Sequence, residues 1–170
     1  MALDAIFTRR SVRQYQDKPV EKEKLLTILK AAMQAPSAAN QQPWEFLVIE
    51  NKDTLKKMTC LSLYASCLAK AAAAILVLKK EKGMPWPDSV DQDLGAATMA
   101  LMLAAVDLGL GSVWLGAAPY ADRIERMKRM FGLPDGISVY SVIALGYPSD
   151  KDANHFEDRF RKSSIHYEQY

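Results

Sequence analysis

The chain has 170 residues, 49% of them hydrophobic and 25% charged, which is ordinary for one globular domain with a sizeable core. The formal net charge is only +2 and acidic residues are interleaved with basic ones, so we exclude a nucleic-acid partner, which requires a segregated basic surface. No apolar run approaches the roughly 20 residues that span a bilayer, and no secretory leader is recognisable, so we expect a cytoplasmic protein without a membrane partner.

Helical patterns recur along the chain. Apolar residues at intervals of three and four predict helices over residues 3–7, 25–33, 53–58, 63–70, 91–108 and 124–131. Asp53 is a suitable N-cap for the third of these, and Gly132 ends the last. The helix over 91–108 is apolar nearly all round, so we expect it to be buried centrally or at a subunit interface.

Short apolar segments between the helices predict strands over residues 44–49, 74–78, 112–115 and 139–145. Because helices and strands are mixed and helices dominate, we predict an α+β class in which helices wrap a sheet, within a single domain over residues 1–170.

The tail that follows Pro148 is polar but carries large rings at Phe156, Phe160, Tyr167 and Tyr170. Aromatic rings left in water are unfavourable, and such a tail usually docks on another surface. We therefore expect residues 149–170 to form an extension that docks on a partner subunit.

Neither metal nor disulfide chemistry is indicated. His155 and His166 form no metal-ligand spacing with the two cysteines, so we predict no metal site. If Cys60 and Cys67 lie on one helix, they are about 10 Å apart along its axis, which is beyond disulfide reach. We expect both to be buried free thiols.

The first segment with chemical potential follows the first predicted helix and contains Arg9, Arg10, Ser11 and Arg13. Three guanidinium groups and a hydroxyl within five residues suit a phosphate, because arginine presents planar, forked donors with a permanent charge. Alternatively, these cations simply close the C-terminus of a helix, where positive charge is favourable. On its own the segment favours this simpler role.

The second segment is the loop of residues 36–43, which prolines bracket. Its short polar side chains, Ser37, Asn40 and Gln42, could hold donors and acceptors beside a planar polar heterocycle. In isolation, an ordinary connection capped by serine and asparagine explains the loop better.

The third segment, residues 109–116, superficially suggests a dinucleotide-binding fingerprint. The third glycine is misplaced and the glycines follow a helix instead of a strand, so we reject that fingerprint. What remains is a helix stop, a strand and Gly116 at its end, where backbone amides can approach a flat ligand.

The last segment, residues 157–162, allows two interpretations. It is either a run of solvated charges, or it places Arg159 or Arg161 on the same phosphate that Arg9 binds. Trp86 stands in a proline-flanked loop and either borders a substrate pocket or packs on the surface.

Together these segments resemble the nitroreductase family along nearly the whole chain. Residues 9–13 and 17–20 match its R-R-S-x-R-like element and D-K-P-V-like turn, and residues 35–44 match A-P-S-x-x-N-x-Q-P-W at every fixed position. Residues 109–116 match G-L-G-S-x-W-x-G, residues 144–148 match A-L-G-Y-P, and Arg159 with His166-Tyr167 matches the tail. The chain departs from the family at residues 98–100, which are Thr-Met-Ala where relatives often carry a Gln-Asn pair.

The resemblance implies an α+β fold with a central, mostly antiparallel sheet of about four to five strands, surrounded by helices, in an intertwined homodimer. It also implies FMN bound at the dimer interface. One subunit would contact FMN through Arg9, Arg10, Ser11, Arg13, Trp114, Leu115, Gly116, Arg159 and Arg161. The other would contribute Pro36, Ser37, Ala38 and Asn40.

The implied activity is an FMN-dependent transfer of electrons from NADH or NADPH to nitroaromatic, quinone or similar acceptors by a ping-pong mechanism. The flavin carries the chemistry, so no catalytic side chain is required. Arg13 is the candidate that would stabilise the reduced ring, and Trp86 would either border the acceptor or pack on the surface. Two alternatives stay open at this point: a flavin-storage module without turnover, or a specialised relative that removes halogens or fragments flavin.

Overall fold

A computed structural model describes residues 2–170. Its α-helices are α1 (Ala2–Thr8), α2 (Lys22–Ala32), α3 (Lys52–Lys57), α4 (Val90–Asp107) and α5 (Ala121–Phe131). Its strands are β1 (Trp44–Ile49), β2 (Ala73–Lys80), β3 (Gly111–Gly116) and β4 (Ile137–Gly146). Short 3-10 turns lie at η1 (Ala38–Asn40), η2 (Met58–Leu61), η3 (Ser66–Lys70), η4 (Pro87–Ser89) and η5 (Lys162–Ser164).

The four strands form one sheet in the order β1-β2-β4-β3, and every neighbouring pair is antiparallel. The two central strands, β2 and β4, are the most apolar and the most buried, as expected for strands that helices cover on both faces. The predicted α+β class and antiparallel sheet are therefore confirmed.

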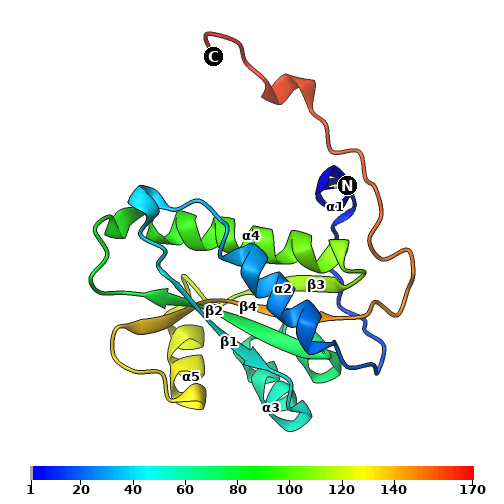
Figure 1. Ribbon diagram of the computed structural model, residues 1–170, viewed down its shortest axis with the longest axis vertical. Coiled ribbons are helices and arrows are strands. Elements are labelled where there is room, and N and C mark those ends of the chain that lie inside the picture. Colours follow the sequence, from blue (N-terminus) through cyan, green and yellow to red (C-terminus); the bar gives the residue numbers. More distant parts are fainter. Residues whose placement is uncertain (1) are drawn as a thin grey trace.

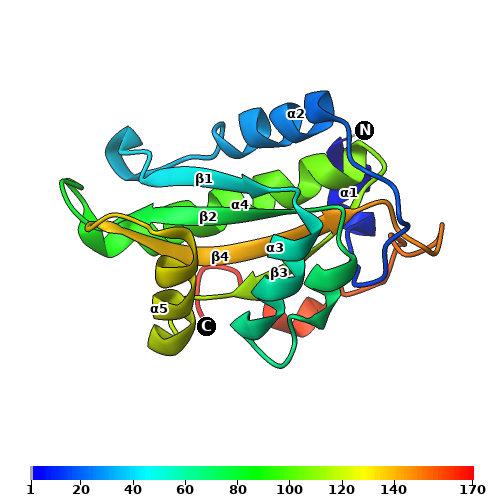
Figure 2. The same ribbon diagram turned by 90° about the horizontal axis from the view of Figure 1, so that it is seen from below.

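Helices cover both faces of the sheet, as Figure 2 shows, with α2 and α4 on one side and α3 and α5 on the other. Side chains of a strand alternate between its faces, and β2 follows this rule. Ile75 and Val77 pack with the α2 and α4 residues, whereas Leu76 joins Leu55 of α3 and Met127 of α5. The sheet thus separates two apolar cores.

Helix α4 is the longest helix in the described part of the chain and confirms the expectation of a buried apolar helix. Leu94, Ala97, Leu101 and Ala105 are fully buried against the sheet and α2. Figure 1 shows α4 running across the molecule, with η4 at its beginning and β3 and α1 near its end. This helix therefore links two distant ends of the protein.

Three local expectations were wrong. The N-cap of α3 is Asn51, whose side chain accepts a hydrogen bond from the Thr54 amide, because the helix starts before Asp53. The helix expected over residues 63–70 is limited to the 3-10 turn η3. Cys60 and Cys67 consequently lie on different turns, and only Cys67 is buried, while Cys60 is exposed.

The C-terminal tail leaves the body of the protein, and residues 155–170 are exposed throughout. In Figure 1 the tail passes α1 and then runs away from the sheet. Within residues 2–170, none of the helices combines the length and the apolar character that a membrane crossing requires.

Candidate functional site

The arginine-rich segment of residues 9–13 lies against the edge strand β3. Ser11 pairs with Ser112 in an isolated parallel bridge, and the Val12 amide donates to the Ser112 carbonyl at 2.9 Å. A Cβ atom built on Gly111 would lie 2.7 Å from the Cβ of Val12, so only glycine permits this close approach. The backbone of the segment is therefore fixed on the sheet.

Asn154 ties the same segment to the beginning of the C-terminal tail. Its side-chain oxygen accepts from the Arg10 amide at 3.2 Å, and its side-chain nitrogen donates to the Leu110 carbonyl at 3.0 Å. Sequence reasoning missed Asn154 because its partners are backbone groups 144 and 44 residues away, and no motif marks them. This bridge brings the two ends of the chain together.

Three guanidinium groups meet at a cavity of about 550 Å³ between α1 and the tail. Its lining residues are Ile6, Phe7, Arg9, Arg10, Met99 and residues 156–160, which include Arg159. The pKa of Arg9 is lowered, first by burial and then by the positive charges of Arg10 and Arg159. Cations that repel one another in a partly buried place favour binding an anion there.

The carboxylate of Glu157 partly neutralises this cluster. Its Oε2 lies 2.6 Å from Nη2 of Arg159 and 3.6 Å from Nε of Arg10. The hydrogen bond from Arg159 holds the pKa of Glu157 below its usual value. The Nε of Arg10 is nevertheless buried with no hydrogen-bond partner, so the cluster retains an unmet donor.

Arg161 is exposed and is absent from the residues that line this cavity. Of the two tail arginines that the sequence left as alternatives, the structure brings only Arg159 to Arg9 and Arg10.

A second cavity of about 350 Å³ lies farther along β3. Arg13 lines it together with Trp114, Leu115 and Gly116 of the strand, and the turn of residues 62–66 lines its opposite wall. Trp114 is 36% exposed, and its ring meets Tyr140 edge to face at 5.8 Å. Arg13 and the end of β3 thus share one pocket.

Arg123 of α5 also lines this second cavity, and sequence reasoning missed it. Its Nη1 donates to the Gly116 carbonyl at 2.9 Å, so the helix that follows β3 holds the end of that strand in place. The sequence showed Arg123 only as one of several alternating charges on an amphipathic helix.

The proline-bracketed loop of residues 36–43 has a strained backbone. Ala39, Asn40 and Gln42 have φ angles of 47°, 56° and 46°, which non-glycine residues rarely adopt. Ser37 Oγ accepts from the Gln42 amide at 3.1 Å, and Asn40 Oδ1 accepts from the Gln42 side chain at 2.9 Å. Strain of this kind persists only where the surroundings hold it, and it often marks a functional loop.

Asp93 of α4, which is 6% exposed, holds this loop. Its carboxylate accepts from the Ala38 amide at 3.0 Å and from Gln41 Nε2 at 2.7 Å. Gln41 also bonds the Trp86 backbone twice, through its amide nitrogen to the carbonyl and through its oxygen to the amide, both at 3.0 Å. The Trp86 segment and the loop therefore form one unit at the beginning of α4.

Within one chain, the two halves of the predicted site lie apart. Figures 1 and 2 place the loop of residues 36–43 at one end of the molecule and α1 with the arginine segment at the other. Helix α4 separates them, and its 18 residues correspond to about 27 Å. Pro36, Ser37, Ala38 and Asn40 accordingly do not line either cavity that contains Arg9 or Arg13.

Comparisons with known proteins agree with the motifs. The sequence model of the Nitroreductase family matches residues 6–82 and 60–147. A protein of Archaeoglobus fulgidus, provisionally named NADH dehydrogenase/NAD(P)H nitroreductase, is 45% identical over 170 residues, covering 99% of this chain and 98% of that protein. A crystal structure from Clostridium acetobutylicum, provisionally described as an NADH oxidase, is 46% identical, with a TM-score of 0.95 over 98% of this chain and 99% of that one. A provisionally assigned nitroreductase from Desulfovibrio desulfuricans, solved in complex with FMN, is 31% identical, with a TM-score of 0.82 over 99% and 97% of the two chains.

Proposed function

The chain belongs to the nitroreductase family, and on that premise we propose that it is an FMN-dependent oxidoreductase that passes electrons from NADH or NADPH to a small-molecule acceptor. The observation that carries the proposal is the convergence of Arg9, Arg10 and Arg159 on one cavity, where the buried Nε of Arg10 has no hydrogen-bond partner. A cluster that needs an anion fits the phosphate of FMN.

Residues from both ends of the chain would hold FMN. Arg9, Arg10 and Arg159 are assigned to the phosphate, and Ser11 to the polar chain that links phosphate and ring. Arg13 and the backbone of residues 114–116 are assigned to the ring, because they line the pocket that lies next along β3. Arg161 lies outside the phosphate cavity, so we assign it no contact.

When bound, FMN supplies the redox chemistry by accepting a hydride from a nicotinamide and passing electrons onward. The protein's part is to bind, orient and stabilise. The permanent charge of Arg13 would favour negative charge on the ring, and the rigid backbone around Gly116 would keep the ring in a fixed plane.

A homodimer would unite the two halves of the site. The loop of residues 36–43 cannot reach the arginine segment of its own chain, so this proposal assigns it to the ring in the second copy. Leu3, Ile6 and Phe7 of α1 are exposed, as are Phe156 and Phe160 of the tail, and burying them is a further reason for dimerisation. Residues 149–170 would then dock on the partner subunit.

Nitroaromatic and quinone-like compounds are the proposed acceptors, and turnover would follow a ping-pong order in which donor and acceptor use the same face of the ring in turn. Trp86 is placed at the edge of this acceptor site, because its backbone is bonded to the loop assigned to the ring. A cytoplasmic location is part of the same proposal.

The absorbance spectrum of the purified protein tests this function directly. We expect a yellow protein whose flavin absorbance is lost on adding NADH or NADPH without oxygen and returns on adding a quinone. Steady-state rates at several fixed acceptor concentrations should give parallel double-reciprocal lines. A colourless protein would refute the assignment of FMN, and a flavin that neither donor reduces would indicate a storage module instead.

A further inference from the structure

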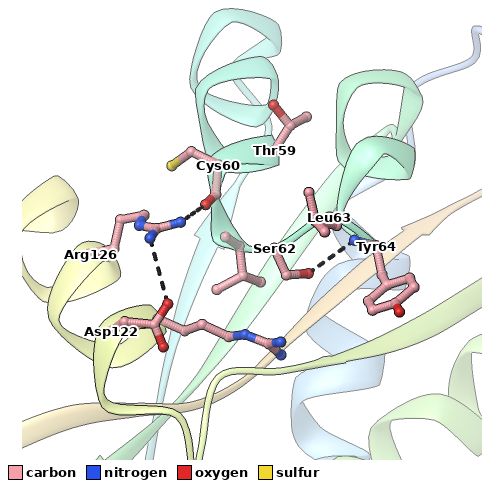
Figure 3. A pocket seen from close by; sticks show the side chains of 9 residues that line it. Thr59, Cys60, Ser62, Leu63, Tyr64, Asp122 and Arg126 are labelled. Atoms are coloured by element: carbon pink, nitrogen blue, oxygen red, sulfur yellow. Dashed lines mark hydrogen bonds and ion pairs between the residues drawn. The ribbon is translucent and has the colours of Figure 1, made fainter.

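A groove next to the proposed ring pocket is not used by the proposed function. It has a volume of about 360 Å³ and lies between residues 59–64 and the first turns of α5, which contribute Asp122, Arg123 and Arg126 (Figure 3). It shares Ser62, Leu63, Tyr64 and Arg123 with the cavity that contains Arg13 and Trp114. The two hollows therefore adjoin across a shared wall, and we call the pair the channel.

The two arginines of the groove are held in place by the protein. Arg126 donates to the Cys60 carbonyl and pairs with Asp122 at 3.5 Å. Arg123 donates to the Gly116 carbonyl, and its guanidinium carbon lies 3.9 Å from the centroid of the Tyr120 ring. These contacts use a minority of the five N–H donors that each guanidinium carries. Pre-positioned donors with spare capacity are what an anionic ligand requires.

Charge and surface character along the channel agree with such a ligand. Arg13, Arg123 and Arg126 line the two hollows, whereas Asp122 is the one acidic side chain among their lining residues. At the shared wall, Leu63 is 96% exposed and Tyr64 is 76% exposed, which leaves apolar surface beside the cations. The channel thus suits an elongated ligand that carries both aromatic rings and negative charge.

We propose that this groove binds the phosphate groups of the nicotinamide dinucleotide that donates electrons, with Arg126 and Arg123 as their ligands. The inference rests on the proposed function. A dinucleotide donor must bring its nicotinamide to the ring pocket, and it then has to place its phosphates and adenosine outside that pocket. The groove is the cationic hollow that adjoins that pocket. A small acceptor has no comparable anionic extension.

The test compares Arg126→Gln with Arg129→Gln, since Arg129 lies exposed on the same helix and lines neither hollow. Two ligands are titrated calorimetrically into the purified protein: NADP⁺ and inorganic pyrophosphate. We expect Arg126→Gln to weaken the binding of NADP⁺ and pyrophosphate about tenfold or more, the usual cost of losing a hydrogen bond between charged groups. Arg129→Gln should bind both ligands as the unaltered protein does.

A second variant should change the affinity for NADP⁺ in the opposite direction. Asp122→Asn removes the negative charge that opposes the phosphates, so we expect it to bind NADP⁺ several-fold more tightly. A merely structural role for the Asp122–Arg126 pair predicts weaker binding in both variants. In the reductive half-reaction, a dihydronicotinamide without phosphates should reduce the unaltered protein and Arg126→Gln at the same rate.

Equal binding of NADP⁺ by the unaltered protein and Arg126→Gln would overturn the proposal, as would equal losses in Arg126→Gln and Arg129→Gln. Slower reduction of Arg126→Gln by the phosphate-free donor would also overturn it, because the variant would then disturb the ring pocket itself. Failure of the proposed function would be seen in the unaltered protein, before any variant is made. That protein would then contain no flavin, or neither NADH nor NADPH would reduce its flavin.

Discussion

Arg9 is partly buried beside two other guanidinium groups, so its side chain is well placed to bind the phosphate of FMN. Arg9→Ala should leave the fold intact but weaken FMN retention about tenfold to a hundredfold, the usual range for a lost hydrogen bond to a charged group. The flavin-to-protein ratio after gel filtration and the dissociation constant from flavin fluorescence measure this loss. Arg161→Ala is the matched control, since Arg161 does not line the cavity. Unchanged flavin content in Arg9→Ala would remove Arg9 from the site.

Tyr15 fastens the arginine segment to the sheet and makes stability depend on pH. Its hydroxyl lies within hydrogen-bond distance of the Val12 carbonyl at 2.6 Å and of the Ala144 carbonyl of β4 at 3.2 Å, and its burial raises the pKa of the phenol above the ordinary value. A raised pKa means that this contribution is fully present below the unfolded pKa of about 10 and is lost as the pH rises above it.

We therefore expect Tyr15→Phe to be less stable than the unaltered protein by about 1 kcal/mol at pH 7. Above a pH of about 10, the advantage of the tyrosine should shrink by up to about 1.4 kcal/mol per pH unit, because only the unfolded phenol ionises easily. Urea unfolding of both proteins at neutral and alkaline pH measures the difference. A difference that stays constant through this range would contradict the assignment.

Among the structural elements, the loop of residues 36–43 depends on a carboxylate from a distant helix. Asp93→Asn keeps an oxygen for the Ala38 amide but turns an N–H₂ group toward the donating nitrogen of Gln41. We expect a loss of about 1–3 kcal/mol in unfolding free energy and faster hydrogen exchange in the loop. If the loop serves the acceptor site, the acceptor KM should rise more than kcat falls.

Asp91→Asn is the control for this prediction. Asp91 lies two residues before Asp93 in α4 and pairs with Lys79 at 2.7 Å, but it is exposed, so loss of its charge should cost less than about 1 kcal/mol. Equal hydrogen exchange of residues 36–43 in Asp93→Asn and the unaltered protein would show that the carboxylate does not hold the loop.

The sequence predicted elements more reliably than the contacts that position them. Periodicity located α2, α4, α5 and all four strands, because burial of one face imposes a repeat on neighbouring residues. Asp93 and Asn154 leave no repeat, since their partners lie far along the chain. Gly111 stood out only as one position of the motif of residues 109–116, but its role is to admit Val12, which only the three-dimensional packing reveals.

At the scale of the whole molecule, the segments that we assign to the site lie at two ends of one chain, and residues 155–170 of the tail are exposed throughout. The resemblance that the motifs carry assigned the loop of residues 36–43 to the other subunit, and in the structure this loop lies far from the arginine segment of its own chain. The motifs alone do not give that distance, because it depends on the path of α4.

The tail supplies the last prediction. A chain that ends after Arg161 keeps Arg159 but loses Ile165, Tyr167 and Tyr170, of which Tyr167 is 81% exposed. Burying one large apolar side chain contributes about 1.5–3 kcal/mol, so the dimer dissociation constant should rise at least about tenfold. Flavin content measured at high protein concentration should stay near that of the full chain, because the arginines assigned to the phosphate remain.

Sedimentation velocity over a dilution series gives the dissociation constant. A full-length chain that sediments as a monomer would refute the shared site, and a truncated dimer as tight as the full one would show that residues 162–170 do not dock on the partner.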